Sequence, residues 1–243
     1  MGETVTNGHR ASLCSVRLPR GGQVFIHQPH KEKQVARSFH TLAMASLVSV
    51  IALSGCALTT DRIELQYQPQ QNVAAVPGAS GVSVGVKIND ARGDKSKVSS
   101  KKNGFGMEMA PILATEDVTI TVRRAIEHEL KARGFKLGAD DAAMVAIAAD
   151  LIRFYNDHKT GFFAGDAVAD LNMSVMVRAR TGEIRYTKQL VAQGVEPNIQ
   201  LMTGNNAKLA LDRALENGMK ILFEDQAFLA ALVSAGSPKT AAR

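Results

Sequence analysis

The chain of 243 residues has no tryptophan, few other aromatic residues, and only two cysteines, Cys14 and Cys56. So few thiols exclude a disulfide framework, and the fold must depend on an ordinary hydrophobic core. The chain also lacks an uninterrupted apolar segment of the ~20 residues that a membrane-spanning helix needs. The apolar stretch at residues 39–53 is too short for that purpose.

Residues suited to catalysis or to cofactor binding are also few. Gly104-Phe105-Gly106 has neither the spacing nor the lysine of a phosphate-binding loop. Two histidines follow residue 56: His128, which we predict on a charged helix face, and His158, which we predict in a loop. Neither has further ligands at the spacing that a metal site requires. We therefore expect no catalytic residue, no metal site and no cofactor.

The short apolar run ends in the motif Leu53-Ser54-Gly55-Cys56. A run of this length that follows positive charges and ends in small residues is typical of a secretory signal. A cysteine at its end can carry a diacylglyceryl group, and two or more acyl chains, such as palmitate, anchor a protein stably in a bilayer. We interpret the motif as a lipobox, residues 37–55 as a lipoprotein signal peptide, and Cys56 as the lipidated residue. The alternatives are an uncleaved signal anchor and a buried helix.

Residues 1–36 form an N-terminal extension without clear periodicity. Most secretory signals begin their charged region close to the first residue. We therefore expect translation to start further along the chain, and Val35 is the candidate start.

The charge of the chain is concentrated in its first part. Residues 1–55 contain six Lys or Arg residues and two Glu residues, so cleavage before Cys56 lowers the formal net charge from +6 to +2. A nearly neutral exported protein is not typical of nucleic-acid binding, because that function needs a basic surface. We expect no nucleic-acid partner.

The remaining sequence divides into three parts by composition. Residues 56–80 are rich in Gln, Pro and Gly and poor in large apolar residues, which predicts a flexible tether. Alternation around Ile63 leaves an edge strand as an alternative there. Residues 81–235 are predicted to form one domain of ordinary size, and residues 236–243 a disordered tail.

Periodic patterns predict the elements of this domain. Alternation of apolar and polar residues predicts strands, and apolar residues four positions apart predict helices. The predicted strands are 82–88, 171–180 and 184–190, and the last two form a hairpin. One predicted helix runs from Thr115 to Gly134. The other runs from Asn205 or Asn206 to Leu232, with a break near Glu224.

One segment, residues 140–155, fits two structures. Its alanine content favours a helix, whereas its alternation favours a strand. With a strand there, the order of elements is β-α-β-β-β-α. This order predicts an α+β fold, with a small, mostly antiparallel sheet and two helices packed on one face.

Two surface features are candidates for partner contact. The segment 95–106 is basic and rich in Ser, and we expect a solvated loop; the alternative is a patch in which Lys101 and Lys102 bind an anionic envelope polymer. The predicted loop at residues 156–165 carries Phe162 and Phe163 between glycines. These rings either fold back onto the sheet or form an exposed apolar contact site.

Several of these segments resemble, in the same order, the YajG family of bacterial lipoproteins. They are the lipobox Leu53–Cys56, the first strand with its exit (Val84–Arg92), the helix end Leu130–Gly138, and the helix 205–232. The resemblance covers most of residues 53–233. It implies export, lipidation, a compact α+β domain and a strand at residues 143–154. It brings no catalytic residues, because the family is largely uncharacterised, and residues 1–36 depart from its pattern.

These expectations describe a lipid-anchored, non-catalytic binding or scaffolding domain of the bacterial cell envelope. Ala57, in place of an Asp after the lipidated cysteine, favours the outer membrane, with the domain on the periplasmic side. An envelope protein or peptidoglycan is the expected partner besides the membrane. The alternatives are an accessory subunit of an envelope machine for peptidoglycan synthesis or secretion, and a hydrolase of cell-wall or lipid substrates.

Overall fold

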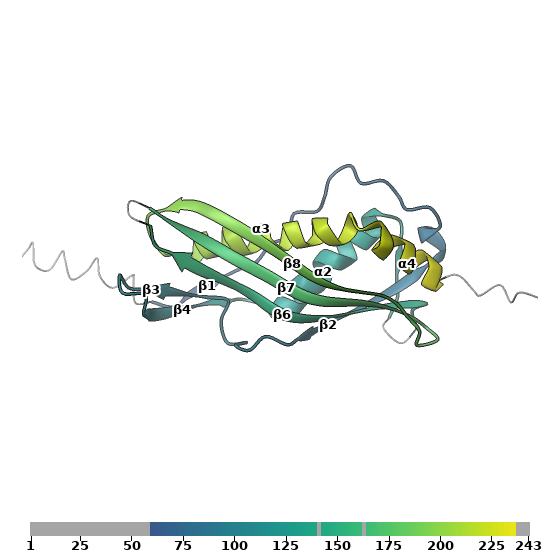
Figure 1. Ribbon diagram of the computed structural model, residues 1–243, viewed down its shortest axis with the longest axis horizontal. Helices are drawn as coiled ribbons and strands as arrows, with labels where there is room; N and C mark the ends of the chain where they lie inside the picture. The colour runs from purple at the N-terminus through teal and green to yellow at the C-terminus, as the bar shows by residue number, and fades with distance from the viewer. Residues whose placement is uncertain (1–58, 140–141, 162–163, 237–243) are drawn as a thin grey trace, which may run out of the picture. The chain divides into compact units, whose positions relative to one another are not determined.

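Two β-sheets and three α-helices make up the part of the chain that the computed structural model describes, residues 59–139, 142–161 and 164–236 (Figure 1). The five-stranded sheet has the order β5 (Lys136–Leu137), β2 (Ser83–Asp90), β6 (Val145–Lys159), β7 (Gly165–Ala179) and β8 (Ile184–Ile199). The three-stranded sheet has the order β1 (Asp61–Ile63), β4 (Glu108–Ala114) and β3 (Ser99–Lys102). The helices are α2 (Val118–Ala132), α3 (Gly204–Phe223) and α4 (Gln226–Gly236), and a short 3₁₀ turn, η2 (Ala79–Gly81), precedes β2.

The α+β class is confirmed, but the sheet differs from the mostly antiparallel one that the sequence suggested. β6, β7 and β8 are antiparallel, whereas β2 runs parallel to both β5 and β6. The connection from β2 to β6 passes through a hairpin and α2, and a crossover of this kind returns the chain in the parallel direction. The three-stranded sheet is also mixed, because β1 is parallel to β4 while β3 is antiparallel to it.

The ambiguous alanine-rich segment is a strand, as the family resemblance implied. β6 is 15 residues long and pairs with β2 on one side and with β7 on the other. Ile147 and Leu151 are fully buried, whereas Ala148 and Asp150 between them are exposed. Burial on one face of the sheet therefore overrides the helix propensity of the alanines.

The ends of α2 show one correction and one confirmed feature. The side chain of Asp117, and not Thr115, caps the helix, since it accepts a hydrogen bond from the Thr119 amide at 2.9 Å. At the other end Gly134 has a φ of 89°, a conformation in which glycine is favoured. The Phe135 amide donates to the Leu130 carbonyl at 3.0 Å, so the helix ends at Gly134 as the sequence predicted.

The expected break in the last helix separates α3 from α4. Asp225 lies at the break and accepts hydrogen bonds from the Ala227 amide at 2.9 Å and from Lys188 Nζ at 2.7 Å. The Tyr186 hydroxyl also donates to Asp225, and these bonds, the one from Lys188 foremost, lower the pKa of Asp225 to about 2. The Asp225 carboxylate thus caps the first turn of α4 and connects this helix to β8.

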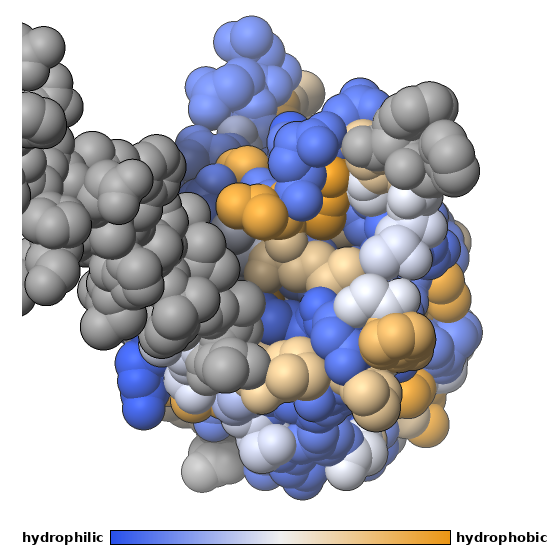
Figure 2. Space-filling view, turned by 90° about the vertical axis from the view of Figure 1, so that its left-hand side faces the viewer, coloured by the Kyte–Doolittle hydropathy of each residue, from blue (hydrophilic) through white to orange (hydrophobic). Residues whose placement is uncertain are grey.

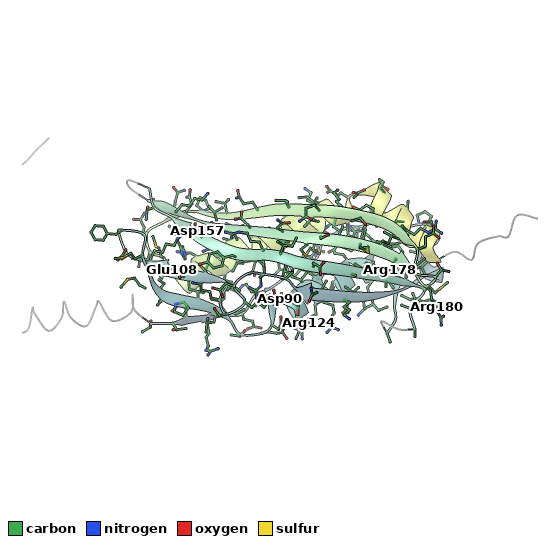
Figure 3. The ribbon with its side chains drawn as sticks, turned by 60° about the horizontal axis from the view of Figure 1, so that its bottom comes forward. Asp90, Glu108, Arg124, Asp157, Arg178 and Arg180 are labelled. Carbon is green, nitrogen blue, oxygen red and sulfur yellow. The ribbon has the colours of Figure 1, made fainter. Side chains whose placement is uncertain are left out.

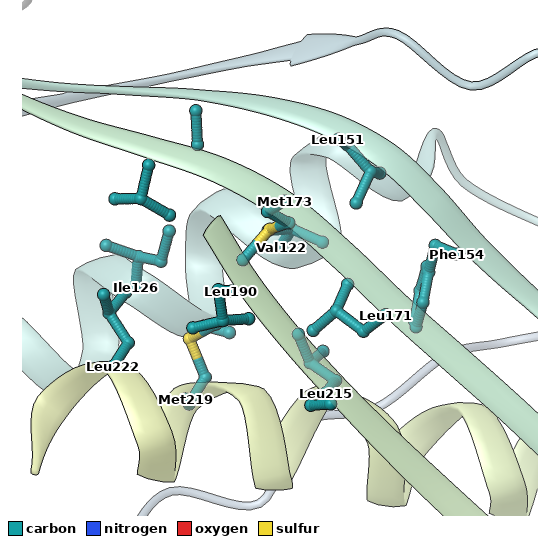
Figure 4. Packing of buried hydrophobic residues seen from close by; sticks show 14 of the residues in the cluster. Val122, Ile126, Leu151, Phe154, Leu171, Met173, Leu190, Leu215, Met219 and Leu222 are labelled. Carbon is teal, nitrogen blue, oxygen red and sulfur yellow. The ribbon is translucent and has the colours of Figure 1, made fainter. Parts of the chain in front are cut away.

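The hydrophobic core lies between the helices and one face of the five-stranded sheet (Figure 4). α2 contacts β2 and β5, α3 contacts β6 to β8, and α4 contacts β7 and β8. Side chains from all these layers meet in the core; among them are Val122, Ile126, Leu151, Leu171, Met173, Leu190, Leu215, Met219 and Leu222.

The segment expected to be a flexible tether is packed against the domain in its described part. β1 lies at the edge of the three-stranded sheet, as the alternation around Ile63 suggested. Further along, the Tyr67 hydroxyl and the Gln70 amide both donate to the fully buried carboxylate of Glu129, at 2.5 Å and 3.0 Å. Glu129 also pairs with Arg133, whose guanidinium lies 4.7 Å from the ring centre of Phe223. Burial and the bond to Glu129 raise the pKa of Tyr67.

α3 lies unusually close to the sheet at Gly194 of β8. A Cβ at this position would be 2.2 Å from the carbonyl oxygen of Ala210 and 2.3 Å from the backbone nitrogen of Ala214. Both atoms belong to the helix backbone, so a larger residue can be accommodated only by moving α3 away from β8.

We predict that Gly194→Ala lowers the free energy of unfolding by about 1–3 kcal/mol, the usual cost of overpacking. Urea unfolding followed by circular dichroism measures the change. Gly93→Ala is the matched control, because a Cβ at Gly93 would have no atom within 4 Å. Equal effects of the two substitutions would contradict the close approach of α3.

Candidate functional site

Four segments meet at the end of the domain where the described chain begins, and we call this region the Thr59 end. It comprises the start of β1, the tip of the β3–β4 hairpin, the β6–β7 turn and the β8–α3 loop. In Figure 1 these segments lie on the left, and the β7–β8 turn lies on the right. The register agrees, since Gly165 at the start of β7 pairs with Ile199 at the end of β8.

Asp61 joins three of the elements at this end. Its Oδ1 accepts a hydrogen bond from Lys101 Nζ of β3 at 2.8 Å, and its Oδ2 accepts one from the Gly204 amide at 2.7 Å. Lys101 Nζ also donates to the Thr59 carbonyl at 2.9 Å. A carboxylate at the first amides of α3 is favourable, because the N-terminus of a helix carries partial positive charge. We call these contacts the Asp61 clasp.

The two lysines that the sequence marked for partner contact are both in ion pairs. Lys101 is 8% exposed and its ammonium group belongs to the Asp61 clasp. Lys102 Nζ lies 2.5 Å from Asp157 Oδ1 of β6. A contact between these lysines and a partner stays a prediction, and it would require the ion pairs to open.

The segment that contains these lysines was expected to be a solvated loop, and the structure corrects this. Ser99 and Ser100 are buried in β3, where the Asn156 side chain donates to Ser99 Oγ at 2.9 Å. Lys97 pairs with Glu108 across the hairpin, and that hydrogen bond raises the pKa of Lys97 and lowers the pKa of Glu108. Figure 3 places Glu108 at the same end as Asp157, away from Arg178 and Arg180.

His158 is also corrected, because it lies in β6 and not in a loop. The side chain is 4% exposed, and its Nδ1 is 3.1 Å from the Ser100 carbonyl oxygen, to which it donates in the neutral ring. Burial lowers the pKa of His158, and the hydrogen bond to Ser100 and the charge of Asp157 oppose this only in part. The neutral imidazole therefore connects β6 to β3.

The lowered pKa of His158 predicts a loss of stability in weak acid. The unfolded chain takes up a proton near the ordinary pKa of 6.5, and the folded chain does so only at lower pH. The free energy of unfolding should therefore be constant above about pH 6.5 and fall below it. Thermal unfolding between about pH 7.5 and 5 measures this dependence. His158→Gln should flatten it, whereas the exposed His128→Gln should not; equal pH profiles for the two variants would contradict the assignment.

Large apolar side chains are exposed at the Thr59 end. Phe105 is 91% exposed at the tip of the β3–β4 hairpin, and Leu201 is 71% exposed in the β8–α3 loop. Met107 and Met109 are exposed beside Phe105. Figure 2 looks onto this end and shows hydrophobic surface between hydrophilic side chains. We call these four side chains the apolar tips.

A small open cavity of about 160 Å³ adjoins Leu201. It lies between the β6–β7 turn and residues 199–202 at the end of β8, and polar and apolar groups line it to equal extents. The loop expected at residues 156–165 is shorter than predicted, because β6 extends to Lys159. Phe162 and Phe163, which were predicted there as contact residues, lie outside the described residues, as do Leu53, Ser54, Gly55 and Cys56.

One pattern that sequence reasoning missed is the match of residues 81–85 to Gly-x-Ser-x-Gly. In hydrolases this motif holds the serine on a sharp turn between a strand and a helix. Ser83 instead lies in β2, where its hydroxyl accepts a hydrogen bond from the Met144 amide at 3.1 Å. The serine therefore has a structural role in joining β2 to the start of β6.

Two further findings concern only the described residues. In that part of the chain, no three His, Cys, Asp or Glu residues are grouped so that they could hold a metal ion. None of the helices that the structure describes has the length and apolar character to cross a membrane.

The comparisons with known proteins identify the family. A family model described as "Uncharacterized lipoprotein" (Lipoprotein_16) matches residues 69–233, which is more than half of the chain. The chain therefore belongs to this lipoprotein family, and the resemblance to the YajG family is confirmed. No curated protein matches the chain.

Solved structures extend the comparison to the fold. Protein XCC0632 from Xanthomonas campestris is 12% identical with a TM-score of 0.52, and the match covers 72% of this chain and 98% of that chain. A minor lipoprotein from Acinetobacter baumannii is 11% identical with a TM-score of 0.36, covering 60% of this chain and 90% of that chain. The first of these likenesses shows a shared fold.

Proposed function

We propose that this protein is a lipid-anchored lipoprotein of the bacterial outer membrane whose domain faces the periplasm and serves as a non-catalytic binding or scaffolding module. The observation that carries the proposal is a cysteine at the end of the motif Leu53-Ser54-Gly55-Cys56, which we interpret as a lipobox, ahead of a domain of a lipoprotein family. The family match begins at residue 69, and Cys56 precedes the first described residue, Thr59, by three positions. Acyl chains on Cys56 would hold the domain at the membrane.

The non-catalytic part of the proposal is supported by three ionisable groups whose shifted pKa values have structural causes. His158 joins β6 to β3, Asp225 joins α4 to β8, and Tyr67 joins the chain start to α2. Perturbed pKa values often mark catalytic sites, but ion pairs and hydrogen bonds that hold a fold together also produce them. Each of these groups has such a structural partner.

We predict that Cys56→Ser abolishes the incorporation of labelled palmitate and removes the protein from the outer-membrane fraction, because the thiol is the acceptor of the first lipid. Metabolic labelling of cells followed by separation of the inner and outer membranes measures both. Cys14→Ser is the matched control, since Cys14 precedes the expected cleavage site and should leave labelling unchanged. Palmitate on the Cys56→Ser variant, or its recovery in the outer-membrane fraction like the parent, would reject the anchor.

A second candidate function is an accessory subunit of an envelope machine. The outer face of the five-stranded sheet supports it, since Ile152, Val191 and Val195 are 40%, 64% and 38% exposed there. Exposed apolar residues on a sheet face can form a protein contact. Crosslinking in intact cells through Val191 would recover a defined protein partner for an accessory subunit and none for a free-standing module.

A further inference from the structure

We propose that the apolar tips at the Thr59 end insert into the surface of the bilayer that holds the acyl chains of Cys56. The domain would then contact the membrane directly, through Phe105, Met107, Met109 and Leu201, and would not hang from its anchor alone. The occupant of this surface is thus the headgroup and upper acyl region of a phospholipid bilayer. The inference rests on the proposed acylation of Cys56.

The first argument is the short distance between the anchor and the tips. The Cα atoms of Cys56 and Thr59 cannot be more than about 11 Å apart, because three peptide units separate them. Thr59 is fixed by the Lys101 ammonium group, and Lys101 lies two residues before the hairpin tip that begins at Asn103. A domain with so short a connection must keep this end at the membrane surface.

The second argument is the chemistry of the tips. Phe105 and Leu201 come from two separate loops, and the described part of the domain leaves them 91% and 71% exposed. Large apolar side chains on loop tips pay for their exposure in water and gain free energy when they enter the boundary between headgroups and acyl chains. Because the two side chains come from separate loops at the same end of the domain, both can take part in one contact with a bilayer.

The third argument is that three carboxylates beside the tips are already paired with lysines. Asp61 is paired with Lys101, Asp157 with Lys102, and Glu108 with Lys97. Unpaired carboxylates would oppose approach to an anionic lipid surface, whereas ion pairs carry little net charge toward it. These three carboxylates therefore carry their lysine partners with them toward the headgroups, and Asp166 at the start of β7 is held by the Asn198 amide.

The absence of tryptophan in the chain provides a direct test. The full-length lipoprotein, purified with its lipid, is reconstituted into vesicles of phosphatidylethanolamine and phosphatidylglycerol that contain phospholipids brominated on their acyl chains. Phe105→Trp and Leu201→Trp each introduce a single fluorophore at one tip. Both variants should show a blue shift of the emission on reconstitution and lose most of it to bromine quenching, because the indole enters the acyl region.

Ile184→Trp is the matched control. Ile184 is 51% exposed beside the β7–β8 turn, at the end away from Thr59, so its tryptophan should keep a solvent-like emission without quenching. Equal, unquenched emission of Phe105→Trp and Ile184→Trp would overturn the inference. Recovery of a protein crosslinked at Phe105, with no quenching there, would also overturn it and assign the tips to a protein partner.

Labelling with palmitate separates this inference from the proposed function. Quenching in a preparation without acylated Cys56 rejects the anchor but supports docking of the tips. Acylation without quenching supports the anchor and rejects docking.

A further variant tests docking without the lipid. The Cys56→Ser chain, with its signal sequence removed and therefore unacylated, should bind the same vesicles. Adding Phe105→Ser should lower this affinity about tenfold or more, as expected for one aromatic side chain. An unchanged affinity would count against the inference.

Discussion

Asp61 is shared between a lysine of the small sheet and the first amide of the longest helix, and the arrangement of the Thr59 end depends on this sharing. One oxygen faces Lys101 and the other faces Gly204, so a single carboxylate holds β1, β3 and α3 in one position. Gly204 is suited to this contact, because a Cβ there would be 2.8 Å from the Cβ of Asp61. β1 is only three residues long, and its backbone bonds alone would hold it weakly. The clasp therefore decides where the polypeptide enters the domain.

A second carboxylate, which is fully buried, fixes the next part of the chain in the same way. Glu129 binds Tyr67, the Gln70 amide and Arg133, and so it fastens the segment after β1 across α2. A buried charge is costly unless it is fully paired, and here hydrogen bonds and a guanidinium satisfy it.

α3 protects the free edge of the large sheet at β8, since the Asn217 side chain donates to the Gln193 carbonyl at 2.8 Å and Arg213 binds the Val195 carbonyl. Such covering keeps an edge strand from pairing with another chain.

The sequence was informative where periodicity extends over many residues, and less so where distant side chains decide the structure. The hairpin of β7 and β8, the start of the last helical region and its break near Glu224 follow from alternation and from spacing, although both strands and the last helix extend beyond the predicted bounds. β3 was not foreseen, since Ser99, Ser100 and the lysines after them look like a solvated loop until Asn156 and Tyr155 are placed beside them. His158 and the segment after β1 were misjudged for the same reason: their burial depends on partners about 60 residues away in the chain. The exposure of Phe105 and Leu201 on neighbouring loops likewise required the fold.

The length of β6, β7 and β8 determines how far from the membrane the other end of the domain would lie. β6, β7 and β8 contain 15, 15 and 16 residues, and at ~3.3 Å per residue they measure about 50 Å from end to end. Because the clasp fixes β1 to the domain, the length of the sheet, and not a flexible linker, would set the distance between the lipid and the far end of the domain on the proposed orientation. On the proposed orientation, the β7–β8 turn with Arg178 and Arg180 would be presented at that height, toward whatever anionic layer lies beyond the membrane.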